Sequence, residues 1–192
     1  ITCTGETLSE QVDRLKPPQP DGTVIYSVKE PFKPTGGLRL LGGNLSPDAS
    51  SVLKLAGVEG GLDNNIFTGQ ARVFDGEQAL LEFLDTSPNE LSDSDMVIVR
   101  YEGPVGGPGM PEMLDSTSRI TAICREKNIV VGLMTDGRFS GGSVGLVIGH
   151  VGPEAATGGP IAFLENGDTI EVNLDKNELN CKQLDDPHIY KS

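Results

Sequence analysis

The chain has 192 residues, a formal net charge of −13, 25 glycines, 13 prolines and no tryptophan. Its length suits one domain with a hydrophobic core of its own. The acidic balance argues against binding to nucleic acid, which needs a basic stripe to neutralise phosphates, and against binding to an anionic membrane surface. The sequence has no run of about twenty apolar residues, the length that a transmembrane helix requires.

Three cysteines, Cys3, Cys124 and Cys181, are scattered along the chain without a C-x-x-C pair. This pattern does not predict a disulfide framework and fits a reducing compartment better. We expect Cys124 in the core, because it lies on an apolar helical face. The start of the chain shows no charged-then-apolar leader, so we expect a cytoplasmic protein, or one of an organelle matrix in a eukaryote.

The first element expected is a short helix. Thr7-Leu8-Ser9-Glu10 has the pattern of a capping box, which predicts a helix as far as about Leu15. Pro17-Pro18-Gln19-Pro20 then ends the helix, and Asp21-Gly22 turns the chain.

Short extended segments then alternate with two amphipathic helices. The expected strands are Leu38 to Leu41, Val52 to Ala56, Gln70 to Phe74, Met96 to Tyr101, Ile129 to Thr135 and Gly145 to His150. Apolar spacing predicts the helices over Gly76 to Leu84 and Ser116 to Lys127.

The last part of the chain predicts a short helix and a hairpin. The helix is expected to start at Pro153-Glu154, since proline suits the first helical turn. Ile161 to Glu165 and Thr169 to Val172, joined by Asn166-Gly167, predict the hairpin. Glu178 to Lys182 is expected to close the sheet.

These elements together predict a mixed α/β fold: a closed or nearly closed β-barrel flanked by helices. The high glycine and proline content favours such short strands and turns over a helical bundle. Periodicity alone leaves an ordinary mixed α/β sheet open as the alternative.

A serine-containing turn follows the expected strand Ile129 to Thr135. It reads Thr135-Asp136-Gly137-Arg138-Phe139-Ser140-Gly141-Gly142-Ser143. Glycine takes a positive φ at little cost, and flanking glycines let a substrate approach the backbone closely. Ser140 is therefore either a site residue or a surface serine of an ordinary glycine-rich hairpin.

A second loop, Tyr101 to Met113, follows the expected strand Met96 to Tyr101. Four glycines and three prolines give it a rigid shape, and it carries the carboxylates of Glu102 and Glu112. Binding and catalytic residues concentrate on loops of this kind, held by a rigid scaffold.

The two loops together closely resemble signature stretches of the C-terminal domain in the dihydroxy-acid dehydratase and 6-phosphogluconate dehydratase family. Four further blocks keep the order of that family: Gly36 to Asp48, Ala71 to Asp75, Gly149 to Ala155, and Gly158 to Ala162. The resemblance implies a swivelling β/β/α barrel, like the mobile domain of aconitases. Residues 1–34 would then be an interdomain connector and residues 35–192 the C-terminal domain.

The resemblance also implies an activity. Members of the family are hydro-lyases that remove water from a 2,3-dihydroxy acid and give a 2-keto acid through an enol. They use Mg²⁺ for the carboxylate and the C2 oxygen, and an iron–sulfur cluster, of the 2Fe–2S type, for the leaving hydroxyl group.

Roles for individual residues follow from the same resemblance. Ser140 matches the base, and Glu112 matches the magnesium ligand of this domain, with a helix N-terminal carboxylate as the alternative. For Glu102, a buried structural or supporting role is as well expected as metal ligation. For His150, a core or supporting role is expected rather than that of a base. The residues expected around substrate and metal are Glu102, Gly107, Asp136, Arg138 and Gly141, with Asp136 and Arg138 forming a pair that orders the turn.

The domain that precedes this one in the family carries the cluster cysteines and the other metal carboxylates. The three cysteines of this chain lie outside the family motifs, so we expect no cluster here and no dehydratase activity from this chain alone. The expected partners are that N-terminal domain, a small 2,3-dihydroxy acid and a second copy in a homodimer.

The sequence favours one branch of the family. Asp136 to Gly142 reads D-G-R-F-S-G-G and resembles the branched-chain amino-acid pathway dehydratase most, whereas sugar-acid and 6-phosphogluconate dehydratases usually differ there. Those two, or a free-standing non-catalytic swivelling domain, remain the alternatives. Gly42 and the Ile120 to Asn128 stretch depart from the usual family pattern.

Overall fold

The computed structural model describes residues 1–54, 62–140 and 145–185. The chain forms two compact units, Ile1–Gly36 and Gly37–Ser192. Among the described residues, no helix combines the length and the apolar character needed to cross a membrane.

The first unit contains the predicted N-terminal helix, α1 (Leu8–Leu15). The predicted capping box is confirmed, because the Glu10 N–H donates to the Thr7 hydroxyl while the Thr7 N–H donates to the Glu10 carboxylate. Further along, the Asp21 carboxylate accepts bonds from the N–H groups of Thr23, Val24 and Ile25, which lower the pKa of Asp21 to about 2.

The second unit is a closed barrel with the strand order β1-β2-β6-β5-β4-β3-β7-β8. Its strands are β1 (Leu38–Gly43), β2 (Ser46–Lys54), β3 (Ile66–Asp75), β4 (Asp95–Arg100), β5 (Gly132–Thr135), β6 (Val147–Gly149), β7 (Thr169–Asn173) and β8 (Glu178–Cys181). The strands β3, β4, β5 and β6 run parallel to one another, and the parallel pairing of Gly42 with Glu178 joins β1 to β8. The predicted mixed α/β barrel with flanking helices is confirmed, including its closure by Glu178 to Cys181.

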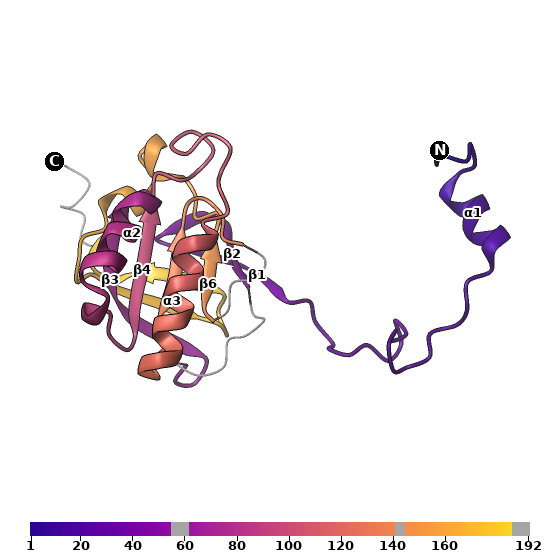
Figure 1. The fold of residues 1–192 in the computed structure, drawn as a ribbon, viewed down its shortest axis with the longest axis horizontal. Helices are drawn as coiled ribbons and strands as arrows, with labels where there is room; N and C mark the ends of the chain where they lie inside the picture. Colours follow the sequence, from indigo (N-terminus) through magenta and orange to yellow (C-terminus); the bar gives the residue numbers. More distant parts are fainter. Residues whose placement is uncertain (55–61, 141–144, 186–192) are drawn as a thin grey trace. The chain divides into compact units, whose positions relative to one another are not determined.

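Two helices cover one side of the barrel. These helices, α2 (Glu77–Thr86) and α3 (Leu114–Lys127), lie on either side of β4 in the view of Figure 1 and match the two helices predicted. Because β4 is covered on both faces, its residues Met96, Val97, Ile98 and Val99 are all fully buried. Met96 and Ile98 belong to the core cluster with Leu41 and Ile148, whereas Val97 and Val99 pack with the helices.

The predicted hairpin from Ile161 to Val172 is wrong. Residues Pro160–Phe163 form a 3₁₀ turn (η3), and β7 pairs instead with β3 and β8. The reason is a side chain that replaces a strand partner: Arg100 Nη1 donates to the carbonyls of Ile161, Ala162 and Leu164. The Asn166-Gly167 turn does exist, with Gly167 at a φ of 92°, and it leads into β7.

The other differences lie at the ends of elements. The helix predicted at Pro153-Glu154 is a 3₁₀ turn, η2 (Ala155–Thr157), because Glu154 is extended and stands before it. The strand β5 starts at Gly132 rather than Ile129, and the predicted strand end at Ala56 lies outside the described residues. Two further 3₁₀ turns are η1 (Pro88–Glu90) and η4 (Lys182–Asp185).

The exposure of the three cysteines predicts the order in which they react with a thiol reagent. Cys3 is exposed, Cys124 is half-buried and Cys181 is fully buried. Burial raises the pKa of the Cys124 thiol, and only the thiolate attacks disulfide reagents. At pH 8 we expect Ellman's reagent to label Cys3 first, Cys124 much more slowly and Cys181 only in denaturant. A Cys3→Ser variant should lack the fast phase, and a fast phase that survives in it would contradict this order.

Candidate functional site

The loops that follow three of the parallel strands meet at one end of the barrel. Because β4, β5 and β6 run parallel, their carboxyl ends lie together, and ligand sites of parallel sheets are commonly built there. The loop after β4 and the turn after β6 lie at this end in Figure 1. They are in contact, since the Val105 and Gly106 N–H groups donate to the Glu154 carboxylate at 3.0–3.1 Å.

The predicted serine turn lies at this end as well. Ser140 follows β5 by five residues and is half-buried, so part of it faces solvent. Inside the turn, the Gly137 N–H donates to the Thr135 hydroxyl at 3.0 Å. The neighbouring Gly141, expected near the substrate, lies outside the described residues.

An arginine ties the serine turn to the Glu112 loop. Arg138 Nη1 lies 3.1 Å from Glu112 Oε1, and Arg138 Nε donates to the Met110 carbonyl at 2.7 Å. Both charged side chains are about half exposed, so the ion pair itself contributes only about 0–1 kcal/mol. Its importance is geometric, because it places the two predicted site loops side by side.

The expected pair between Asp136 and Arg138 is wrong, since Arg138 forms its ion pair with Glu112. The Asp136 side chain points the other way and is only 2% exposed. It accepts bonds from the N–H groups of Tyr101 (3.1 Å), Glu102 (3.0 Å) and Ala155 (2.9 Å). One buried carboxylate therefore holds the starts of two loops.

The Glu102 side chain binds the first residue of α2. Its Oε1 accepts from the Glu77 N–H at 2.8 Å and so caps the N-terminus of α2. Glu77 in turn accepts from the Ser116 hydroxyl at 2.8 Å in the first turn of α3. Of the roles left open for Glu102, the structure supports the structural one.

Glycine is required at two positions, Gly107 and Gly137, because the Glu102 backbone lies directly against both. A Cβ at Gly107 would lie 2.8 Å from both Cα and Oε2 of Glu102, and a Cβ at Gly137 would lie 2.5 Å from the Glu102 carbonyl oxygen. His150 is exposed and has a φ of 56°, so the core role is wrong, and the supporting role expected beside it stays a prediction. Its backbone N–H donates to the Gly137 carbonyl.

Sequence reasoning missed two residues of this end of the barrel, Glu77 and Glu154. An acidic residue in the first turn of a helix is a capping signal, which could have identified Glu77. For Glu154 the only signal is its place in the block Gly149 to Ala155, because its partners Val105 and Gly106 are distant in sequence.

The chain does not contain a complete metal centre within its described residues. No three His, Cys, Asp or Glu side chains gather there as metal ligands. Glu112 offers one exposed carboxylate, a suitable oxygen ligand for Mg²⁺. The cysteines do not suit an iron–sulfur cluster, since Cys181 is buried in the barrel core, Cys124 lies on α3 and Cys3 belongs to the first unit.

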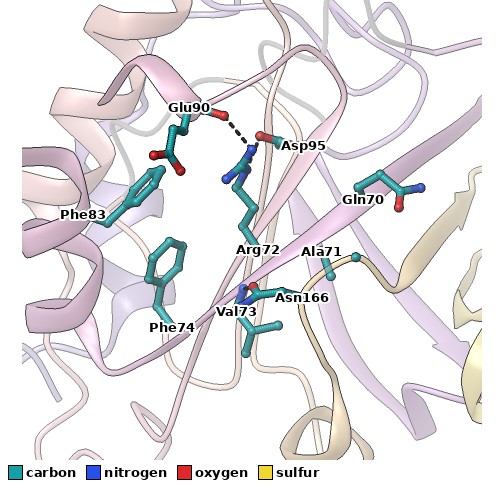
Figure 2. Close-up of a pocket in the computed structure, with 10 residues that line it drawn as sticks. Gln70, Ala71, Arg72, Val73, Phe74, Phe83, Glu90, Asp95 and Asn166 are labelled. Atoms are coloured by element: carbon teal, nitrogen blue, oxygen red, sulfur yellow. Dashed lines mark hydrogen bonds and ion pairs between the residues drawn. The ribbon is translucent and has the colours of Figure 1, made fainter. Parts of the chain in front are cut away.

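A pocket of about 500 Å³ lies away from these loops, on the outer side of β3 (Figure 2). It is lined by Phe74, Phe83 and Asn166 among others, and Arg72 crosses it. The Arg72 guanidinium donates to Asp95 and to the Glu90 carbonyl, and it stacks 5.8 Å from the centre of the Phe83 ring. Arg72 is thus engaged by the protein itself.

Comparison with known proteins identifies the family. Residues 23–189 match the model of the family described as "Dihydroxy-acid/6-phosphogluconate dehydratase C-terminal". The chain is 46% identical over 180 residues to a protein of Mycobacterium sp. (strain JLS) and 48% identical over 174 residues to one of Mycobacterium leprae. It is 44% identical over all 192 residues to one of Mycobacterium avium. Each of these relatives is named dihydroxy-acid dehydratase.

The relatives are much longer than this chain. The matched regions cover 94%, 91% and 100% of this chain but 30%, 29% and 32% of the relatives. The chain therefore spans about a third of the length of the curated relatives it matches.

The close approach at Gly107 leads to a stability prediction. Gly107→Ala should lower the free energy of unfolding by about 1–3 kcal/mol, the usual cost of forcing atoms into a packed site. Urea denaturation measures this loss. Gly37→Ala is the matched control, because a Cβ there meets nothing within 4 Å, and its effect should stay within about 0.5 kcal/mol. Equal effects of the two changes would show that the loop is not tightly packed on Glu102.

Proposed function

The chain belongs to the dihydroxy-acid/6-phosphogluconate dehydratase C-terminal family, and we propose that it is the C-terminal domain of a dihydroxy-acid dehydratase. The reaction is the dehydration of a 2,3-dihydroxy-3-methyl acid to a 2-keto acid, as in branched-chain amino-acid biosynthesis. The observation that carries the proposal is the Arg138 bridge, which joins the Ser140 turn to the Glu112 loop at one end of the barrel.

In this proposal Ser140 is the base. As its alkoxide, Ser140 takes the proton from C2, the C2–H electrons form the C2–C3 double bond, and the C3–O bond breaks with its electrons going to the oxygen. The departing hydroxide takes the proton back from Ser140 and leaves as water, which restores the alkoxide, and the resulting enol tautomerises to the 2-keto acid. Serine is a poor base without electrostatic help. One feature of the described residues supports the role: a cation, Arg138, lies two residues away in sequence on the same turn.

Glu112 is the proposed ligand for the magnesium ion. It directly precedes Met113, the N-cap of α3, and its carboxylate is exposed. When bound, the ion would offset the negative charge of the substrate carboxylate and C2 oxygen. The remaining ligands, and all ligands of an iron–sulfur cluster, would come from the N-terminal domain of the same enzyme.

The choice of substrate class rests on two observations. The turn reads D-G-R-F-S-G-G from Asp136 to Gly142, and the relatives at 44–48% identity are named dihydroxy-acid dehydratase. We further propose that residues 1–34 connect the two domains, that the barrel swivels, and that the enzyme is a homodimer. The boundary between the compact units, at Gly36 and Gly37, supports a connector of this length.

The 192-residue chain alone should show no dehydratase activity, because Glu112 is one ligand and Mg²⁺ gives up its waters reluctantly. The assay uses 2,3-dihydroxy-isovalerate with Mg²⁺ and an iron–sulfur reconstitution mixture, with the intact enzyme as positive control. Turnover by the chain above a no-protein control, or tight saturable Mg²⁺ binding at Glu112 followed by NMR, would refute this division of ligands.

Ser140→Ala in the intact enzyme should lower kcat by about 10²–10⁴-fold, the usual contribution of a general base. The fold should survive, since a half-buried turn serine contributes little to the core. The measurement is kcat at matched metal and cluster occupancy. Ser118→Ala, at an exposed position of α3, is the control and should retain kcat.

If Ser140→Ala keeps kcat within about threefold of wild type, far less than loss of a base should cost, Ser140 is only a turn residue. If sugar acids or 6-phosphogluconate turn over in place of dihydroxy-isovalerate, the substrate class is wrong while the family assignment stands.

A further inference from the structure

We infer that Asp136 is a positioning residue that sets the placement of Ser140 relative to Glu112 through a closed ring of contacts. The inference rests on the proposed function for the roles of Ser140 and Glu112. The ring itself rests only on the geometry of the described residues.

The ring starts inside the barrel end. Asp136 directly follows β5 and lies four residues before Ser140. Its Oδ1 accepts from Glu102 N–H, and its Oδ2 accepts from both Tyr101 N–H and Ala155 N–H. The position of the serine turn is thereby linked to the start of the loop after β4.

Two glutamates carry the link onward to the Glu112 end of that loop. Glu102, whose backbone Asp136 holds, caps α2 at the N–H of Glu77. The Glu77 side chain then binds the hydroxyl of Ser116, in the first turn of α3. Since α3 begins at Leu114, two residues after Glu112, this bond helps to fix the position of Glu112 just before the helix.

Arg138 closes the ring. It lies two residues after Asp136 and binds both the Glu112 carboxylate and the Met110 carbonyl. The backbone at Glu112 is therefore held from two sides, by α3 through Glu77 and by the serine turn through Arg138. Asp136 is the most deeply buried charged member, at 2% exposure.

The chemistry of the acceptor explains why a carboxylate is needed at this position. Three N–H donors converge on two oxygens, and both oxygens must accept. An asparagine has one oxygen and one NH₂ group, so in either orientation the NH₂ group would face an N–H donor. At least one buried donor would lose its partner, which is costly away from water. The loop would then shift, and a misplacement of about 1 Å can cost about 100-fold in rate.

Asp95 provides a matched control. It is also a buried carboxylate, at 5% exposure, and it also accepts a backbone N–H, from Ser92, together with the Arg72 guanidinium. It begins β4, whereas Asp136 follows the carboxyl end of β5, so the two lie at opposite ends of the parallel strands. Loss of its charge should affect stability but not the geometry at Ser140.

The test compares Asp136→Asn and Asp95→Asn in the intact enzyme. Asp136→Asn should lower kcat by about 10–100-fold with KM within about threefold, while Asp95→Asn keeps kcat within about threefold even if its melting temperature falls equally. Hydrogen exchange followed by mass spectrometry should show faster exchange over residues 101–107 and at Ala155 in Asp136→Asn. Exchange at Leu133, whose N–H binds the Leu146 carbonyl, should not change.

Three results would overturn the inference: kcat of Asp136→Asn within threefold of wild type, an equal loss of kcat in both variants, or unchanged exchange over residues 101–107. If Asp136→Asn does not fold, Glu77→Ala decides, because it breaks the same ring at a half-buried position. It should lower kcat about tenfold, and an unchanged kcat would overturn the inference.

The experiment separates this inference from the proposed function. If the wild-type enzyme dehydrates the dihydroxy acid and Ser140→Ala abolishes turnover while Asp136→Asn does not, only the positioning role fails. If the wild-type enzyme shows no such turnover, the proposed function fails, and with it the positioning role of Asp136 for that reaction. The exchange measurement then still tests whether Asp136 anchors the two loops, since it requires no substrate.

Discussion

The carboxylate of Asp136 is almost fully removed from water, and three backbone N–H groups replace its hydration. A buried charge is tolerated only with such compensation, so the donors and the acceptor determine each other's positions. Tyr101 and Glu102 start one loop, and Ala155 starts the 3₁₀ turn of another. The arrangement of both loops at the barrel end therefore depends on this group together with apolar packing, since Met113 and Ala155 also belong to the core clusters.

The barrel supplies the rigid frame for that interaction. Four neighbouring parallel strands bring their carboxyl ends together, and closure between β1 and β8 removes the free edges of the sheet. Because β4 is packed on both faces, its carboxyl end has a fixed position, and so does the start of the loop that follows it. As a result, loops that are 30 or more residues apart in sequence meet with bonds near 3 Å, such as those from Val105 and Gly106 to Glu154.

The sequence predicted the fold well where local patterns decide it. The capping box at Thr7, the helices α2 and α3, and the presence of the barrel strands follow from local spacing and are confirmed. The strand ends are less well predicted, since β2 starts at Ser46 rather than at Val52. The main failure arises where a distant side chain replaces a local partner: Arg100 binds the carbonyls of Ile161, Ala162 and Leu164, where a hairpin was predicted. At the site, the loops were predicted, but the partners of Asp136, Arg138 and Glu102 were not. Those partners depend on which strands are neighbours in the barrel, and the spacing of apolar residues along the chain does not show this.

Exposure divides the residues of this barrel end into two groups. Asp136 is buried and engaged only with its own chain, whereas Glu112 and Arg138 are about half exposed. An exposed ion pair of this kind is weak, so Arg138 neutralises the Glu112 carboxylate without competing strongly for it. In the proposed enzyme, a cation supplied by the other domain can take this carboxylate at little cost. Arg138 would keep its bond to the Met110 carbonyl and so stay beside the Glu112 loop. The weak ion pair thus leaves the Glu112 carboxylate available to bind metal, while the bond from Arg138 to Met110 keeps the backbone of the loop in place.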